Sequence, residues 1–367
     1  MKRFSKLISL LLLLSMAVSL LAACGEEATT TTTTPPPAPM GKNVIYMIGD
    51  GMGFNHIENT KLYMGVEELS FEKYYVGEVT TYSYSDDITD SAASATALAT
   101  GNKTENEYVG MDIQGNDLEN IMEISKDNGR KTSIVTTDVV HGATPGGFSA
   151  HTDRRTDKFG IMNDQMEGAV DLLLAKYDSS CMTSQNKYIK AGFQYTESFA
   201  DLASFDKNSR IIGNLKNTAS PFDPAYANTE TVSLKAMVEY ALNYLTADTE
   251  YPFTLMIEGA QIDKRNHDND IMGMIYALME FDEAAAYVLN WASQRDDTVV
   301  IITADHESGG LKLAESKEAL RNGLYTSDDH TAANVPLYLY GATATKDVLD
   351  NIEIFTIANN AVWGKDE

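Results

Sequence analysis

Acidic and histidine side chains follow several short apolar runs in this 367-residue sequence, and they are of the types that bind metal ions. Asp50 and Glu258 each follow such a run, and Asp305 and His306 follow another. Carboxylates that converge on one place repel one another unless cations hold them. Carboxylate oxygens and imidazole nitrogens together suit zinc. These positions therefore predict a site with more than one metal ion.

Two further candidate ligands, Asp263 and His267, lie four residues apart. On one helical turn their side chains would point the same way. An Asp-x-x-x-His pair is weak evidence when it stands alone. Its occurrence together with the acids after the apolar runs and with the later His330 is much harder to explain as surface chance. We therefore interpret these residues as parts of one metal centre.

Ser91 is the candidate nucleophile, and it lies in a stretch of small residues, 89–98. Small residues favour a closely packed helix that would begin near Ser91, where backbone N–H groups and the helix dipole favour a phosphate. The alternative is that Ser91 or Asp90 serves only as a helix N-cap. The sequence has no Gly-x-Ser-x-Gly motif, so activation of the hydroxyl by a metal ion is the natural route.

The elements that would position these side chains alternate between strand and helix. The apolar runs barely alternate in polarity, which is typical of strands buried on both faces. The predicted strands are residues 43–48, 131–136, 253–257 and 298–303, and the predicted helices are residues 117–128, 163–177, 233–246 and 270–294. This order predicts an α/β fold with a mainly parallel central sheet flanked by helices, which binds ligands at the carboxyl ends of its strands. Residues 178–230 are polar and are predicted to form an irregular insertion or cap.

The first residues have the features of a secretion signal. Three bases precede an apolar run that ends in Leu-Ala-Ala before Cys24, which resembles the lipobox of bacterial lipoproteins. We expect residues 1–23 to be a signal peptide and Cys24 to carry lipid, which would anchor the protein outside the cytoplasm on the bacterial cell envelope. The alternative is a transmembrane helix, for which the run is slightly short and lacks following bases. The Thr- and Pro-rich residues 24–42 predict an extended tether, and residues 43–363 predict one catalytic domain.

Charge and cysteine content exclude other classes of protein. The formal net charge is −25, which argues against binding to nucleic acid phosphates and against electrostatic docking on an anionic membrane. Cys24 and Cys181 are the two cysteines of the sequence, so a disulfide framework is excluded.

Six blocks of the sequence together resemble the alkaline phosphatases. They are GDGMG from Gly49, TDSAASATALATGNKT from Thr89, ATPGGFSAHTDRR from Ala143, EGAQIDKRNH from Glu258, TADHESGG from Thr303 and DDHTAANVPLYLYG from Asp328. They occur in the family's order and span nearly the whole predicted domain. Because candidate ligands stand in these blocks, the resemblance is specific.

The resemblance implies a role for each matching residue. It places a first zinc ion on Asp263, His267 and His330, a second on Asp50, Asp305, His306 and Ser91, and a magnesium ion on Asp50, Thr144 and Glu258. It implies that Arg155 clamps the phosphate as a bidentate fork and that Lys264 contacts the phosphate through water. One position departs from the family pattern: Gly142 stands where the family has Asp or His, so either the neighbouring His141 takes over or the third site holds more water.

The implied activity is hydrolysis of phosphate monoesters at alkaline pH, through a phosphoserine on Ser91 that releases inorganic phosphate. A related two-metal phosphodiesterase or phosphomutase is the alternative among enzymes. A non-catalytic surface lipoprotein on the same fold is the alternative from another class. A homodimer and a monomer are both compatible with the sequence.

Overall fold

The structure is a computed structural model that describes residues 41–247, 251–321 and 324–365 of the chain. These residues fall within one compact unit. The predicted signal peptide 1–23, Cys24 and nearly all of the tether 24–42 lie outside the described residues, so those predictions stay predictions.

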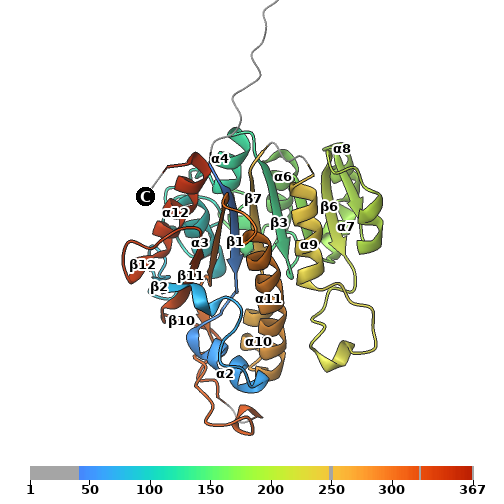
Figure 1. The fold of residues 1–367 in the computed structure, drawn as a ribbon. Helices are drawn as coiled ribbons and strands as arrows, with labels where there is room; N and C mark the ends of the chain where they lie inside the picture. Colours follow the sequence, from blue (N-terminus) through green and yellow to red (C-terminus); the bar gives the residue numbers. More distant parts are fainter. Residues whose placement is uncertain (1–40, 248–250, 322–323, 366–367) are drawn as a thin grey trace, which may run out of the picture. The chain divides into compact units, whose positions relative to one another are not determined.

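In the described part of the chain, ten strands form one sheet in the order β12-β2-β11-β8-β1-β7-β3-β4-β6-β5 (Figure 1). The strands are β1 (Asn43–Ile48), β2 (Tyr75–Thr80), β3 (Lys131–Thr136), β4 (Leu172–Lys176), β5 (Phe193–Thr196), β6 (Arg210–Leu215), β7 (Phe253–Glu258), β8 (Thr298–Thr303), β11 (Val335–Tyr340) and β12 (Val348–Asp350). All neighbours pair in parallel except β11, which is antiparallel to both β2 and β8. The predicted α/β fold with a mainly parallel sheet is confirmed.

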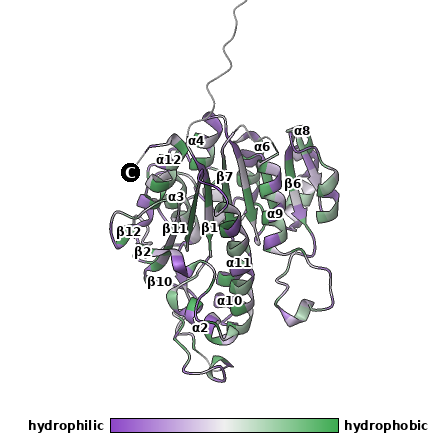
Figure 2. Cartoon of the chain, in the orientation of Figure 1, coloured by the Kyte–Doolittle hydropathy of each residue, from purple (hydrophilic) through white to green (hydrophobic). Residues whose placement is uncertain are grey.

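Helices cover both faces of the sheet. They are α2 (Phe54–Met64), α3 (Ser91–Thr100), α4 (Ile121–Asp127), α5 (Ala143–Gly147), α6 (Lys158–Glu167), α7 (Ser179–Thr183), α8 (Gln185–Lys190), α9 (Leu234–Leu245), α10 (Gln261–His267), α11 (Ile271–Ala292) and α12 (Asn351–Trp363). Helices α9 and α11 pack together, and α12 packs on α3 and α4 (Figure 1). Hydrophobic residues line the strands and helix faces that meet in this core (Figure 2). None of the helices in the described ranges has the length and apolar content of a membrane span.

Two predicted segments differ from the structure. The prediction of a helix over 163–177 is wrong for its second half. Helix α6 ends before Gly168, and residues 172–176 form the buried strand β4. A short apolar run does not distinguish a strand from a buried helix by its periodicity. The segment 178–230, expected to be irregular, contains β5 and β6 at the edge of the sheet. Strand β5 is only partly buried, which explains why polar residues within it hid the strand pattern.

The register of the central strands aligns their carboxyl ends at one edge of the sheet. Ile48 at the end of β1 pairs with Glu258 on one side and with Thr303 on the other, and Thr136 of β3 also pairs with Glu258. The loops that follow β1, β3, β7 and β8 therefore start next to one another. The turn after β1 needs glycine at Gly51, where φ is +74° and a Cβ would lie 2.7 Å from the hydroxyl of Ser308.

Candidate active site

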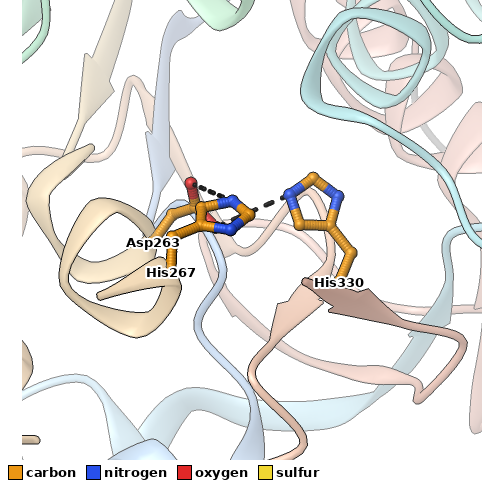
Figure 3. A group of neighbouring side chains, drawn as sticks. All are labelled: Asp263, His267 and His330. Atoms are coloured by element: carbon orange, nitrogen blue, oxygen red, sulfur yellow. Dashed lines mark ion pairs between the residues drawn. The ribbon is translucent and has the colours of Figure 1, made fainter. Parts of the chain in front are cut away.

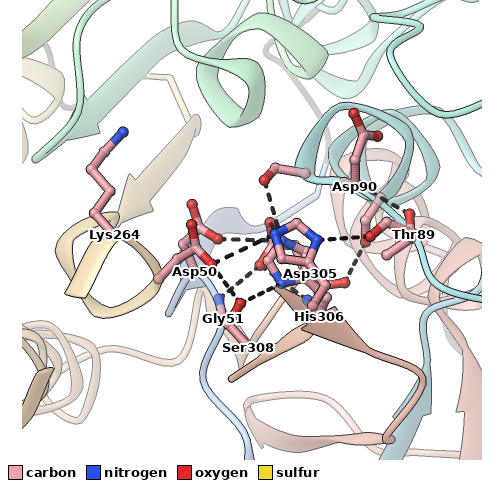
Figure 4. A network of polar contacts seen from close by, with 12 residues as sticks. Asp50, Gly51, Thr89, Asp90, Lys264, Asp305, His306 and Ser308 are labelled. Atoms are coloured by element: carbon pink, nitrogen blue, oxygen red, sulfur yellow. Dashed lines mark hydrogen bonds and ion pairs between the residues drawn. The ribbon is translucent and has the colours of Figure 1, made fainter. Parts of the chain in front are cut away.

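A cluster of acids and histidines occupies the edge of the sheet where these loops meet (Figure 4). Figure 4 shows Asp50, Asp305, His306 and Ser308 gathered together, with Asp90 on one side and Lys264 on the other. Asp50, Asp305 and His306 are all at least nine-tenths buried. Parallel strands in register therefore bring together ligand types that are far apart in the sequence.

Asp263, His267 and His330 form one group of possible metal ligands (Figure 3). Helix α10 carries the first two on one turn, and the short strand β10 (His330–Thr331) presents the third. Nε2 of His267 lies 3.3 Å from Oδ2 of Asp263, and Nε2 of His330 lies 3.7 Å from Oδ1 of Asp263. The structure brings together the three residues predicted for one zinc ion.

A second group surrounds Nε2 of His306. This nitrogen lies 3.2 Å from Oδ2 of Asp305, 3.5 Å from Oδ1 of Asp50 and 3.2 Å from Oγ of Ser91. Ligand atoms about 2.0–2.1 Å from a tetrahedral zinc ion lie ~3.3 Å from one another. Nε2 of His306 is therefore at ligand spacing from each of the other three atoms. Asp263 also lies within 4.8 Å of Asp50 and His306, so the two groups are adjacent.

The three histidines present the same ring nitrogen to these groups. Nδ1 of His267 lies 2.6 Å from the carbonyl oxygen of Asp328, and Nδ1 of His330 lies 2.8 Å from that of Thr89. A carbonyl oxygen only accepts hydrogen bonds, so both Nδ1 atoms donate and Nε2 is left for a metal ion. The hydroxyl of Ser308 donates to Asp263, and its oxygen lies 3.2 Å from Nδ1 of His306.

The charges in the cluster indicate a shortage of cations. Burial, and then repulsion from Asp305 and Asp263, raises the pKa of Asp50 well above its ordinary value. Burial opposes ionisation of Asp263, yet its bond to His267 and the charge of His306 lower its pKa. Oδ1 of Asp50 and Oδ2 of Asp305 are buried and accept no hydrogen bond from any described residue. Such orphaned oxygens among nitrogen donors fit bound metal ions.

Ser91 is the first residue of α3, and it is 4% exposed. The side chain of Asp90 caps this helix by accepting a hydrogen bond from the backbone of Ala93 at 2.9 Å. Cap and candidate nucleophile are thus neighbouring residues, so the helix that Asp90 starts directs Ser91 toward His306. A Cβ on Gly147 of α5 would lie 2.7 Å from that of Ala95, which shows how closely small residues let α5 approach α3.

Arg155 reaches the same place from the loop after α5. Its Nη1 lies 3.0 Å from Oδ2 of Asp90, so Asp90 both caps α3 and holds the guanidinium beside Ser91. Burial opposes the charge of Arg155, but Asp90 keeps its pKa raised. The predicted phosphate clamp therefore lies next to the predicted nucleophile.

Lys264 forms an ion pair with an acid from the loop after β3. Its ammonium lies 3.0 Å from Oδ2 of Asp138, and Figure 4 shows the side chain extending away from His306. Burial opposes its charge, yet Asp138, and more weakly Asp50 and Glu258, raise its pKa. Its contact with phosphate through water stays a prediction.

The predicted third-site residues Glu258 and Thr144 lie at the end of β7 and in α5. Burial, and then the charge of Asp138, raises the pKa of Glu258 to about 7. The hydroxyl of Thr136 donates to Glu258. His141, one of the two explanations for Gly142, instead has its Nε2 3.0 Å from Oδ1 of Asp178.

Several residues of the site were not predicted from the sequence. Ser308 and the carbonyl groups of Thr89 and Asp328 orient the histidines, and Asp138 pairs with Lys264. Ser308 follows His306 by two residues within a block that resembles the family. Asp90 precedes Ser91 and was predicted as a possible N-cap, which is confirmed, whereas its bond to Arg155 was not predicted. The backbone carbonyls have no sequence signal.

Comparisons with known proteins show which protein family this chain is similar to. A family model described as "Alkaline phosphatase" matches residues 41–171 and 182–361. Alkaline phosphatase 3 of Bacillus subtilis is 32% identical over 290 residues, which cover 74% of this chain and 62% of that protein, so the chain spans less than two thirds of that relative's length. The structure of alkaline phosphatase from the Antarctic bacterium TAB5 matches with a TM-score of 0.78 and 26% identity over 90% of this chain and 100% of the other. A variant of the TAB5 enzyme, with aspartate replacing a histidine and "Mg bound in the M3 site", matches with a TM-score of 0.77 and 26% identity over the same shares.

Proposed function

The chain belongs to the alkaline phosphatase family, and from that membership we propose that it hydrolyses phosphate monoesters at alkaline pH through a phosphoserine on Ser91. The observation that carries the proposal is the position of the Ser91 hydroxyl. Its Oγ lies 3.2 Å from Nε2 of His306, the nitrogen that also faces the carboxylates of Asp50 and Asp305. A serine hydroxyl at ligand spacing within a metal-binding group is poised to become a nucleophile.

The proposed cofactors are two Zn²⁺ ions and one Mg²⁺ ion. Asp263, His267 and His330 would hold one zinc ion, and Asp50, Asp305 and His306 would hold the other. Thr144 and Glu258, with Asp50, would hold magnesium. Bound at these residues, the metals would lower the pKa of the serine hydroxyl and stabilise the leaving oxygen.

The chain's own residues would carry out the remaining steps. Oγ of Ser91 gives its proton to solvent and attacks phosphorus, while the bond from phosphorus to the ester oxygen breaks and the leaving alkoxide takes a proton from water. The guanidinium of Arg155, held by Asp90, binds the non-bridging oxygens on which negative charge is spread. Water then attacks the phosphoserine, the bond to Ser91 breaks, and inorganic phosphate leaves. Ser91 regains its proton.

A comparison of two substrates tests the activity. We expect rapid hydrolysis of p-nitrophenyl phosphate and little hydrolysis of bis(p-nitrophenyl) phosphate, because a diester lacks the third non-bridging oxygen and the second negative charge that Arg155 and the metal ions together would bind. Preference for the diester would favour the phosphodiesterase instead. Stoichiometric zinc without hydrolysis of either ester would favour the phosphomutase, and the absence of both zinc and hydrolysis would favour the non-catalytic lipoprotein.

We also propose that Cys24 carries lipid and anchors the protein to the cell envelope. The support is the sequence alone, since an apolar run ending in Leu-Ala-Ala precedes this cysteine. Growth of the expressing bacterium with radiolabelled palmitate should label the protein, and the substitution Cys24→Ala should remove the label. Equal labelling of that variant would contradict the anchor.

A further inference from the structure

The loop after β3 contains an acidic side chain in the space that faces Gly142. A Cβ at position 142 would lie 2.6 Å from Oδ2 of Asp138, closer than real Cβ atoms approach such an oxygen. Position 142 therefore has no room for a side chain while Asp138 keeps this position. The carboxylate of Asp138 fills the volume that a larger residue at 142 would occupy.

Asp138 faces the buried acid at the end of β7. The hydroxyl of Thr136 connects the two residues, since it donates to Glu258 and accepts from the backbone N–H of Asp138 at 2.8 Å. The ammonium of Lys264 is 3.0 Å from Oδ2 of Asp138 and is attracted by Asp50 and Glu258 as well. Three carboxylates thus share this region with one lysine.

An independent observation shows that the region is built to receive a ligand. Thr144 is 1% exposed, and its Oγ1 has no hydrogen-bond partner among the described residues. Helix α5, which carries Thr144, contacts strand β7, which ends in Glu258. Buried polar atoms without partners are rare, so the unpaired hydroxyl of Thr144 indicates a bound group.

The chemistry of these donors fits hydrated magnesium. Mg²⁺ prefers oxygen ligands, and it usually keeps several waters while binding only one or two carboxylates. Oδ2 of Asp138 is already paired with the ammonium of Lys264 at 3.0 Å. A contact through water on the ion therefore suits Asp138 better than direct ligation. Nε2 of His141 pairs with Asp178 instead.

We propose that Asp138 replaces the side chain that Gly142 lacks, and that it holds a hydrated Mg²⁺ at Glu258 and Thr144 by accepting hydrogen bonds from the ion's water. This inference rests on the proposed function, because it assigns a new residue to the third metal of that site. Lys264 positions Asp138 by binding one of its oxygens. Asp138 is a positioning residue for the ion rather than a catalytic one.

Magnesium binding to the purified, zinc-loaded full chain tests the inference without measuring turnover. Isothermal titration with Mg²⁺ should show one site in the unsubstituted protein. Replacing a group that hydrogen-bonds a metal's waters lowers metal affinity by roughly 10- to 100-fold. We expect that loss in both Asp138→Ala and Asp138→Asn, with two zinc ions still bound. Asp296→Ala, an exposed residue before β8 at the opposite end of the strands, is the matched control and should bind Mg²⁺ normally.

A double substitution makes the test more specific. In Asp138→Ala with Gly142→Asp, the new carboxylate enters the volume that Asp138 has left, and Mg²⁺ affinity should recover. Unchanged Mg²⁺ affinity in both Asp138 variants, verified as folded by circular dichroism, would overturn the inference and leave the phosphatase proposal intact. Absence of ester hydrolysis by the unsubstituted protein would overturn the phosphatase proposal, while the magnesium titration would still decide the role of Asp138.

Discussion

At the scale of single residues, the hydroxyl of Ser91 is the group on which the proposed chemistry depends. We expect Ser91→Ala to abolish covalent labelling by a ³²P-phosphate monoester after acid quenching, since no oxygen remains to form the phosphoserine. Ser94→Ala is the control, because Ser94 lies on the same helix and donates instead to the carbonyl oxygen of Asp305. Label that persists in Ser91→Ala would show that another residue is the nucleophile.

Asp90 has two functions that substitutions can separate. Asparagine also caps helices, so Asp90→Asn should keep the stability of α3 while losing the ion pair with Arg155. The freed guanidinium binds phosphate less well, and we expect the inhibition constant for inorganic phosphate to rise roughly 3- to 10-fold, as for the loss of about 1 kcal/mol. Asp90→Ala should show the same rise and lose a further ~1 kcal/mol of unfolding free energy. An unchanged inhibition constant in Asp90→Asn would remove Arg155 from phosphate binding.

Most of the candidate ligands could be predicted from the sequence, whereas the groups that orient them could not. Residue type and position after an apolar run identify Asp50 or Asp305 as possible ligands. The carbonyl of Thr89 that fixes the tautomer of His330 belongs to the backbone, which carries no sequence pattern. Asp138 could not be found either, because its proximity to Gly142 depends on the path of the loop after β3.

At the scale of elements, Glu280 connects two helices through a buried carboxylate. It lies on α11 and accepts a hydrogen bond from the backbone of Leu234, at the start of α9, at 2.8 Å. Burial raises its pKa from 4.5 to about 7. Because the folded-state pKa is the higher one, its contribution to stability is complete below pH 4.5 and is lost as the pH rises toward 7.

The substitution Glu280→Gln should remove this pH dependence. Glutamine keeps the acceptor for Leu234 but does not ionise, so between pH 5 and pH 8 the variant should lose less unfolding free energy than the unsubstituted protein, by up to about 3 kcal/mol. Urea unfolding of both proteins in the same chelator measures the difference. The control is Glu239→Gln, since Glu239 is exposed on α9. Identical pH profiles for Glu280→Gln and the unsubstituted protein would contradict the buried, protonated acid.

Three central strands, β1, β3 and β8, were predicted with their correct bounds. Strands β1 and β8 begin and end where their apolar runs do, since every residue in them is buried and polarity changes sharply at the ends. Strands β4 and β5 were missed for two different reasons. The apolar run of β4 follows a helix and is too short to show a period, and β5 is a partly buried edge strand with polar residues.

At the scale of the whole molecule, metal binding should be coupled to stability. The folded chain, whose net charge is −25, buries several carboxylates close together. They belong to Asp50, Asp263, Asp305 and Glu258. Ligands that bind only the folded state stabilise it. Chelation of the purified protein should therefore lower the melting temperature by several degrees, and added Zn²⁺ should restore it. A melting temperature that chelation does not change would mean that the cluster holds no metal in solution.

The most direct test of the central claim is a zinc titration of the metal-free protein with p-nitrophenyl phosphate hydrolysis as the signal. The two adjacent ligand groups predict that the rate at alkaline pH rises with added Zn²⁺ and levels off near two ions per chain, with saturating Mg²⁺ present throughout. A protein that hydrolyses the ester equally well without metal, or that binds two zinc ions and hydrolyses none, would contradict a metal-dependent phosphatase.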